Sequence, residues 1–173
     1  MNLQDFIRNI PDFPKKGIIF KDITTLLKDP NAFHIAAEML YNFAKNLGVQ
    51  KVAGIESRGF VFGSLLAQRL KAGFVPIRKP KKLPAEVYSA SYTLEYGEDT
   101  LEMHKDAISE GEKVLLHDDL LATGGTAQAA CSLIEKAGGR IVQVSFLIEL
   151  AFLNGREKLK GYDVVSVMRY DSE

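Results

Sequence analysis

The sequence predicts an α/β fold in which a central, mostly parallel sheet is flanked by helices. Short runs rich in Val and Ile, such as 51–56, 74–78 and 113–119, alternate with longer segments of helical periodicity. This alternation is typical of a parallel sheet whose strands are buried on both faces. The 173 residues suffice for one compact domain with a sizeable core, so we expect a single domain over 1–173.

The first fifty residues are predicted to hold two helices separated by an irregular segment. Apolar residues within 3–10 have helical spacing, and Pro11 ends that pattern. The stretch PDFPKKGIIFKDIT is irregular, although GIIFKDI within it is typical of a short buried strand. The second helix is well marked, because Asp29 is a good N-cap, Pro30 suits the first helical position and Gly48 ends the pattern.

The rest of the chain alternates strands and helices, with one interruption. The predicted strands are 51–56, 74–78, 113–119, 140–150 and 162–170, and the predicted helices are 59–73 and 125–137. The interruption is 78–104, where a Lys- and Pro-rich opening precedes a period-2 alternation of Tyr, Leu and Ser. We expect a long loop that runs into an antiparallel hairpin, and long loops of compact domains often act as lids.

Composition and charge argue against several classes of protein. Lys plus Arg and Asp plus Glu both number 22, so the basic excess that is usual in nucleic-acid binders is missing. No apolar run approaches the length of a membrane span, and the first residues lack the apolar core of a signal peptide. We therefore expect a cytoplasmic protein with no nucleic-acid or membrane partner. The single cysteine, Cys131, is expected to be a small core residue.

The stretch HDDLLATGGT, residues 117–126, combines two carboxylates with a loop of small residues. Asp118 and Asp119 end a predicted strand, and ligands of open α/β sheets bind at that end. The glycines before the next helix leave backbone N–H groups for a phosphate, and Thr123 and Thr126 add hydroxyl donors. Because carboxylates accept hydrogen bonds from a vicinal diol, a sugar phosphate fits both halves. The alternative is an acidic pair that caps the next helix beside a glycine turn.

Six stretches in order resemble the type I phosphoribosyltransferase family, most closely its adenine-specific branch: PDFPKKGIIFKDIT, GIESRGFVFG, IRKPKKLP, YTLEYG, DDLLATGGT and NGREKLKGYDVVS. The resemblance implies that family's fold, with an N-terminal hood over about 1–28 and a flexible β-hairpin lid over about 79–100. It implies purine salvage, in which the phosphoribosyl group of phosphoribosyl pyrophosphate (PRPP) moves to adenine and gives AMP and pyrophosphate. It further implies Mg²⁺ as cofactor and a homodimer.

The resemblance also assigns roles to individual residues. The ribose and 5′-phosphate of PRPP would be bound by Asp118, Asp119, Ala122, Thr123, Gly124, Gly125 and Thr126. Pyrophosphate would be bound by Glu56, Ser57, Arg58, Gly59, Arg78 and Lys82, with a non-proline cis peptide at Glu56–Ser57. Adenine would be bound by Ile19, Phe20, Lys21 and Leu120. The catalytic residues would be Glu95, Arg58 and Tyr96. No direct protein ligand of the metal is implied, and Asp118 and Asp119 are the candidate contacts through water.

Some of these residues have simpler interpretations. Glu56 and Arg58 could form a surface ion pair, and Glu95 could be an ordinary polar residue at the end of a hairpin. His117 stands where the family usually has a β-branched aliphatic residue; we expect a core histidine, and an effect on the acidic pair is the alternative. Lys81 stands where the family commonly has glycine, which leaves the conformation of the lid's opening loop undecided.

Three other functions are the alternatives to the adenine reaction. A 6-oxopurine phosphoribosyltransferase typically carries an acid where this chain has Ala122, and the hood matches the adenine branch instead. A xanthine enzyme or a related PRPP-sensing regulator is the second alternative, but a regulator would need a DNA-binding domain and a basic face. A catalytically silent PRPP-binding module would lack the ESRG loop and the lid, and this chain has both.

Overall fold

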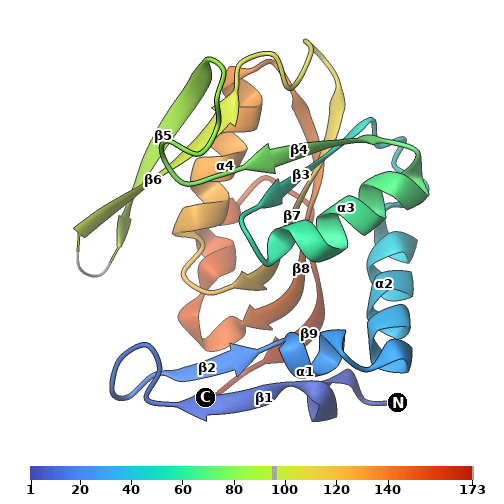
Figure 1. Cartoon of the computed structure of the whole chain (residues 1–173), viewed down its shortest axis with the longest axis vertical. Helices are drawn as coiled ribbons and strands as arrows, with labels where there is room; N and C mark the ends of the chain where they lie inside the picture. Colours follow the sequence, from blue (N-terminus) through green and yellow to red (C-terminus); the bar gives the residue numbers. More distant parts are fainter. Residues whose placement is uncertain (95–96, 173) are drawn as a thin grey trace.

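The computed structural model describes residues 1–94 and 97–172. At its centre lies a sheet with the strand order β4-β3-β7-β8-β9 (Figure 1). These strands are β4 (Gly73–Ile77), β3 (Lys51–Ile55), β7 (Lys113–Leu121), β8 (Arg140–Leu150) and β9 (Val164–Tyr170). Each neighbouring pair is parallel, so the predicted parallel sheet is confirmed.

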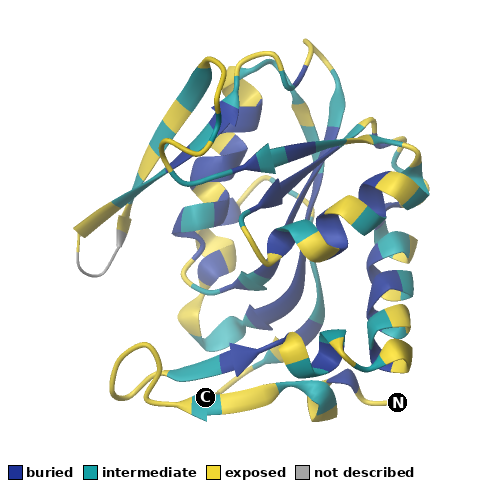
Figure 2. Cartoon of the chain, in the orientation of Figure 1, coloured by how far each residue is buried: buried dark blue, intermediate teal, exposed yellow. Residues whose placement is uncertain are grey.

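Helices cover both faces of this sheet. Against one face lie α2 (Pro30–Ala44) and α3 (Gly59–Leu70), and against the other lies α4 (Gly125–Lys136) (Figure 1). Neighbouring residues of one strand serve opposite faces, as strand geometry requires. Val52 and Leu115 belong to the apolar cluster under α2 and α3, whereas Ala53 and Leu116 belong to the cluster under α4. Figure 2 shows the buried stripes of the helices turned toward the sheet.

Local signals place the helix ends close to the predicted positions. The Asp29 side chain caps α2 by accepting hydrogen bonds from the backbone N–H groups of Asn31 at 3.0 Å and Ala32 at 2.8 Å. Gly124, with φ of 84°, precedes α4 in the left-handed conformation that glycine adopts at little cost. Cys131 is buried within α4, which confirms the expected core position.

The helix predicted over 3–10 is wrong in its second half. A 3₁₀ helix spans Leu3–Phe6, and Arg8–Pro11 is instead strand β1. β1 pairs antiparallel with β2 (Ile19–Asp22), which confirms the short strand expected within GIIFKDI. Helical spacing over so few residues says nothing about this pairing, because the partner strand follows an irregular loop. The β1–β2 ribbon lies at the end of the molecule where both termini are found, and α1 (Thr24–Leu27) joins it to α2 (Figure 1).

The expected antiparallel hairpin is present between β4 and β7. It consists of β5 (Val87–Leu94) and β6 (Gly97–His104), and it leans on α4 (Figure 1). Leu101 and Met103 of β6 are fully buried in the cluster under α4, so the hairpin is packed at its base. The predicted catalytic residues Glu95 and Tyr96 lie outside the described residues.

Two smaller observations bear on the site and on the expected partners. β7 runs to Leu121, two residues beyond its predicted end, so Asp118 and Asp119 belong to the strand itself. In the described part of the chain, no helix combines the length and the apolar character needed to cross a membrane.

Asp22 ties the β1–β2 ribbon to α1, and its ionisation should make the fold sensitive to acid. Its carboxylate accepts hydrogen bonds from the Thr24 backbone N–H at 2.9 Å and from Arg8 Nε at 3.0 Å, and these bonds lower the pKa of Asp22 to about 2. A carboxyl whose pKa is depressed by folding stabilises the fold above its unfolded pKa of 3.8, and this stabilisation is lost as the pH falls toward the folded pKa.

We therefore expect the stability difference between the wild type and Asp22→Asn to be constant above about pH 4 and to shrink between about pH 4 and pH 2. Urea unfolding across this range measures the difference. Asp171→Asn, at an exposed ion pair with Arg169, is the control, and its difference should stay near zero. A difference for Asp22→Asn that did not change with pH would contradict the expectation.

Candidate active site

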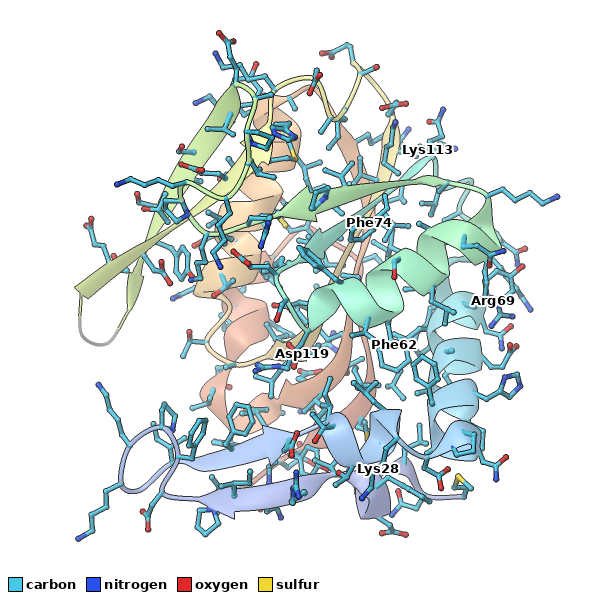
Figure 3. All side chains as sticks on the ribbon, in the orientation of Figure 1. Lys28, Phe62, Arg69, Phe74, Lys113 and Asp119 are labelled. Carbon is cyan, nitrogen blue, oxygen red and sulfur yellow. The ribbon has the colours of Figure 1, made fainter. Side chains whose placement is uncertain are left out.

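A cavity of about 280 Å³ opens at the carboxyl ends of β3 and β7. Its lining comes from the loop after β3, from the end of β7, from the loop that leads into α4, and from the lid region through Lys79, Tyr92 and Leu101. Figure 3 shows Asp119 beside the first turn of α3, where these segments meet. Ligands of open α/β sheets bind at this edge, so the cavity lies where the predicted site was expected.

The two carboxylates at the end of β7 occupy different surroundings. Asp119 is 3% exposed, and its Oδ2 accepts a hydrogen bond from Arg58 Nε at 2.5 Å. The Oδ1 of Asp118 accepts a hydrogen bond from the Asp119 backbone N–H at 2.9 Å. Burial, together with the neighbouring charge of Asp119, raises the pKa of Asp118 well above its ordinary value. Donors or cations brought by a ligand would favour the charged form of Asp118.

Gly59 allows α3 to begin directly against the acidic pair. A Cβ at Gly59 would lie 3.0 Å from Asp118 Oδ1 and 3.1 Å from the His117 carbonyl oxygen, closer than side chains normally pack. With any other residue, the first turn of α3 or the end of β7 would have to shift by a few tenths of an ångström. The glycine therefore keeps Arg58, which immediately precedes the helix, within reach of Asp119.

The loop between β7 and α4 has the features of a phosphate site. Ala122, Thr123, Gly124 and Thr126 line the cavity, and α4 begins at Gly125. Because the N-cap is a glycine, no side chain caps the first turn, and its backbone N–H groups can donate to an anion. In the residues described, the loop and the acidic pair thus face one cavity, as the sequence predicted.

The loop after β3 has the cis peptide bond expected at Glu56–Ser57. Glu56 accepts hydrogen bonds from Arg78 Nη2 at 3.2 Å, from Lys82 Nζ at 3.3 Å and from the Lys79 backbone N–H. Burial acts to raise the pKa of Glu56, but these hydrogen bonds hold that pKa below its ordinary value. The alternative of an ion pair between Glu56 and Arg58 is wrong, because Arg58 pairs with Asp119 and Glu56 pairs with cations that follow β4.

The lid hairpin is joined to its opening loop by a polar cluster that sequence reasoning missed. Lys79 Nζ pairs with Asp99 and donates to the Tyr92 hydroxyl at 3.1 Å, and that hydroxyl donates to Asp99 Oδ2 at 3.1 Å. We call Lys79, Tyr92 and Asp99 the lid latch. A signal was available, because Tyr92 and Asp99 face each other in the register of the predicted hairpin. The basic run supplied Lys79, but its partner could not be read from sequence alone.

The backbone at Lys81 gives a physical reason why glycine suits this position. Its φ is 67°, in the left-handed region where glycine is favoured and other residues are strained. Its backbone N–H donates to Glu102 Oε2 at 3.0 Å, which ties this turn to β6. The loop thus keeps the conformation that glycine favours although a lysine stands there.

Of the residues predicted for adenine, only Leu120 belongs to the cavity lining. The Phe20 ring is reached through Arg58, whose guanidinium carbon lies 5.1 Å from the ring centre. Ile19 lies beside Phe20 in β2. Lys21 Nζ donates to Asn9 Oδ1 at 3.0 Å and lies over the Tyr170 ring. This lysine therefore links β2 to β1 and β9.

His117 is fully buried in the position expected of a core histidine. Its Nδ1 lies 2.9 Å from Ser145 Oγ, and its ring meets the edge of Phe62, labelled on α3 in Figure 3. Burial lowers the pKa of His117 to about 3, so the ring is neutral at physiological pH. The prediction of a core position is confirmed, and an effect on the acidic pair stays a hypothesis.

Comparison with known proteins identifies the family. A model of the phosphoribosyl transferase domain matches residues 22–169. An adenine phosphoribosyltransferase of Christiangramia forsetii is 59% identical over 98% of this chain and 99% of its own length. The chain belongs to the adenine phosphoribosyltransferase family.

Solved structures of this family agree with the fold. The adenine phosphoribosyltransferase of Thermoanaerobacter pseudethanolicus is 53% identical with a TM-score of 0.94, covering 98% of this chain and 100% of that one. The enzyme of Saccharomyces cerevisiae, complexed with an imino-altritol bisphosphate and adenine, is 40% identical with a TM-score of 0.88. The match covers 95% of this chain and 96% of the yeast chain. The type I phosphoribosyltransferase fold is therefore confirmed.

The predicted family residues separate into three groups. Those that line the cavity are Glu56, Ser57, Arg58, Asp118, Asp119, Leu120, Ala122, Thr123, Gly124 and Thr126. Those described but outside its lining are Ile19, Phe20, Lys21, Gly59, Arg78, Lys82 and Gly125. Glu95 and Tyr96 belong to the part that is not described. Several of the second group still touch cavity residues, as the pairs of Arg78 and Lys82 with Glu56 show.

The lid latch should control how often the hairpin opens. We expect Asp99→Asn to speed hydrogen exchange of the β5–β6 amides about fivefold, because losing one charge-assisted contact of this kind costs about 1 kcal/mol. Hydrogen-exchange mass spectrometry of 87–104 measures the effect. Glu86→Gln, which removes an exposed pair with Lys105 just beyond the other end of the hairpin, should leave exchange unchanged. Equal exchange in Asp99→Asn and the wild type would contradict the role of the latch.

Proposed function

We propose that the chain transfers the phosphoribosyl group of PRPP to adenine in purine salvage, forming AMP and releasing pyrophosphate. The observation that carries this proposal is the meeting, in one cavity, of the acidic pair at the end of β7 and the glycine-rich loop that follows it. A ribose 5-phosphate has the hydroxyls for the first and the anion for the second. Full-length relatives named adenine phosphoribosyltransferase support adenine as the acceptor.

The site divides PRPP among three groups of residues. The N–H groups and hydroxyls of Ala122–Thr126 bind the 5′-phosphate, and the ribose diol faces Asp118 and Asp119. Pyrophosphate lies against Ser57–Gly59, with Arg58, Arg78 and Lys82 as its cations. These cations already have carboxylate partners, so they are held near the cavity without an excess of positive charge. When pyrophosphate binds, it replaces these carboxylates as the anionic partner of the cations.

Adenine lies between the hood and Leu120, with the Phe20 ring on one face. Aromatic stacking accepts any purine, so the choice of adenine falls to hydrogen bonds from the Ile19 backbone. The contact between Arg58 and the Phe20 ring supports this placement, because it brings the hood to the edge of the cavity. Glu95 as the general acid/base near N7, and Tyr96 beside it, belong to the proposal through the family resemblance.

The reaction replaces one bond at C1′ of the ribose by another. The bond from C1′ to the pyrophosphate oxygen breaks and pyrophosphate leaves with the electron pair. Adenine N9 bonds to C1′ while the proton of the adenine imidazole ring passes to the proposed general base, Glu95. Positive charge gathers on the sugar while both bonds are long, and the carboxylates of Asp118 and Asp119 favour that charge. Positioning supplies most of the remaining effect, and lid closure over 79–100 excludes water that would hydrolyse PRPP.

Magnesium fits the oxygen donors of this cavity. Mg²⁺ keeps several waters and is commonly held by one or two carboxylates together with substrate phosphates. Asp118 and Asp119 both line the cavity, and in 1–94 and 97–172 no group of three or more His, Cys, Asp or Glu could hold an ion unaided. Asp118 and Asp119 would hold the ion through water, and the phosphates of the substrate would supply its other oxygen donors. Bound there, it would offset charge on the leaving pyrophosphate.

The proposal includes a homodimer in the cytoplasm. The dimer is implied by the family resemblance, in which Arg78 can reach pyrophosphate across the interface; within one chain, Arg78 pairs with Glu56. Sedimentation analysis of the purified protein tests the dimer directly. The cytoplasmic location is an expectation from the sequence, and fractionation of cells that express the chain tests it.

Pyrophosphate release from PRPP should occur with adenine and should require Mg²⁺. Adenine, hypoxanthine, guanine and xanthine are assayed in parallel, with and without a chelator. We expect turnover with adenine alone and its loss on metal removal. Turnover with a 6-oxopurine would overturn the assignment of the base, and PRPP binding without turnover with any base would favour a sensor.

Replacing either aspartate should cost activity far more than stability. We expect Asp118→Asn and Asp119→Asn to lower kcat/KM by about a hundredfold or more, because each removes a charge at the reacting sugar. Asp118→Asn should unfold no more readily than the wild type, because the raised pKa of Asp118 shows that its charged form is unfavourable in the fold. Steady-state kinetics and urea unfolding measure both effects.

Asp106→Asn, at an exposed position, is the matched control for charge removal. It should leave both kcat/KM and the free energy of unfolding unchanged. If the two active-site variants lost fold and turnover in equal measure, the aspartates would be structural groups and the assignment of the ribose site would fail.

A further inference from the structure

The segment Asn154–Leu159 packs against the loop Ala122–Thr126, which is proposed to bind phosphate and which we call the phosphate loop. A Cβ at Gly124 would lie 2.3 Å from the Gly155 carbonyl oxygen. A Cβ at Gly155 would lie 2.3 Å from the Ala122 carbonyl oxygen and 3.1 Å from the Gly124 nitrogen. The two backbones therefore touch with no space for a side chain between them. We call Asn154–Leu159 the backing segment.

Arg156 fixes the backing segment to the ends of two strands. Its Nε and Nη2 donate to Glu149 Oε1 and Oε2, each at 2.7 Å, and its Nη1 donates to the Val164 carbonyl oxygen at 2.8 Å. Glu149 is 3% exposed at the end of β8, and Ser166 Oγ of β9 donates to it at 2.7 Å. A two-pronged pair of this kind sets the orientation of the guanidinium as well as its position.

The phosphate loop has little of its own to hold it in place. Gly124 lies at φ of 84° and carries no side chain that could anchor the turn. A site that binds phosphate through converging N–H groups requires them to stay within a fraction of an ångström of their positions. Gly155 is the backbone against which this turn rests, and Arg156 is the next residue along the chain.

We infer that Arg156 is a positioning residue for the phosphate site: its pair with Glu149 holds Gly155 against Ala122–Gly124 and thereby sets the affinity for the 5′-phosphate of PRPP and AMP. The inference rests on the proposed function, in which this loop binds the phosphate. It concerns one half of the substrate, because pyrophosphate lies against the loop after β3, which Arg156 does not touch in the described structure.

The test uses ribose 5-phosphate and pyrophosphate as separate probes of the two loops. Calorimetry measures both affinities for the wild type, Arg156→Ala and Arg156→Lys. We expect Arg156→Ala to weaken ribose 5-phosphate about tenfold and to leave pyrophosphate within about twofold, because a misplaced loop loses its converging donors. Arg156→Lys keeps the charge without the two-pronged geometry and should fall between. The KM for PRPP should rise while the KM for adenine stays unchanged.

Arg169→Ala is the matched control. Arg169 Nη1 lies 3.6 Å from the same Glu149 carboxylate, but Arg169 belongs to β9 and not to the backing segment. It should leave ribose 5-phosphate binding unchanged. If Arg156→Ala does not fold, Arg156→Lys carries the comparison with Arg169→Ala.

Two results would overturn the inference. One is wild-type affinity for ribose 5-phosphate in both Arg156 variants. The other is an equal loss of ribose 5-phosphate and pyrophosphate binding, which would mark Arg156 as a general support of the fold. A wild-type protein that binds pyrophosphate but no ribose 5-phosphate would remove the proposed phosphate site first, and the inference with it.

Discussion

Two carboxylates stand side by side at the end of the central strand, and their repulsion has to be balanced by whatever surrounds them. Asp119 takes Arg58 as its partner, while burial and that neighbouring charge leave Asp118 reluctant to ionise. Gly59 allows α3 to start close enough for this pairing. The hood then joins the same group, because Arg58 also lies over Phe20. Segments that are far apart in the sequence thus meet around this pair of carboxylates.

The same principle extends to the other cations around the cavity. Arg78 and Lys82 are held by Glu56, and Lys79 is held by Asp99 of the hairpin. A cavity surrounded by unpaired cations would be costly to maintain and would attract any anion. Pairing balances the positive charge beside the cavity while the groups suited to pyrophosphate stay within reach. On the proposed function, selectivity for PRPP then depends on geometry more than on net charge.

The sequence was informative wherever a local rule decides the structure. Val- and Ile-rich runs became the parallel strands, Asp29 capped α2, and Gly124 preceded α4. It failed where a distant partner decides. Residues 8–11 form a strand because 19–22 pair with them, and Arg58 and Asp119 meet from positions 61 residues apart. Family resemblance named the candidate site residues, but their present partners depend on tertiary packing that no single stretch encodes.

The position of β7 has a consequence for how the chain folds during its synthesis. β7 is the middle strand, and it pairs with both β3 and β8. During synthesis β3, α3, β4 and the hairpin all leave the ribosome before β7 does. One edge of β3 therefore stays without its neighbour for a few seconds at ordinary rates of translation. Exposed strand edges can pair with other chains, so a chaperone would be most useful for covering the edge of β3 during this interval. The strand that carries the acidic pair is thus also the strand that covers this edge of β3.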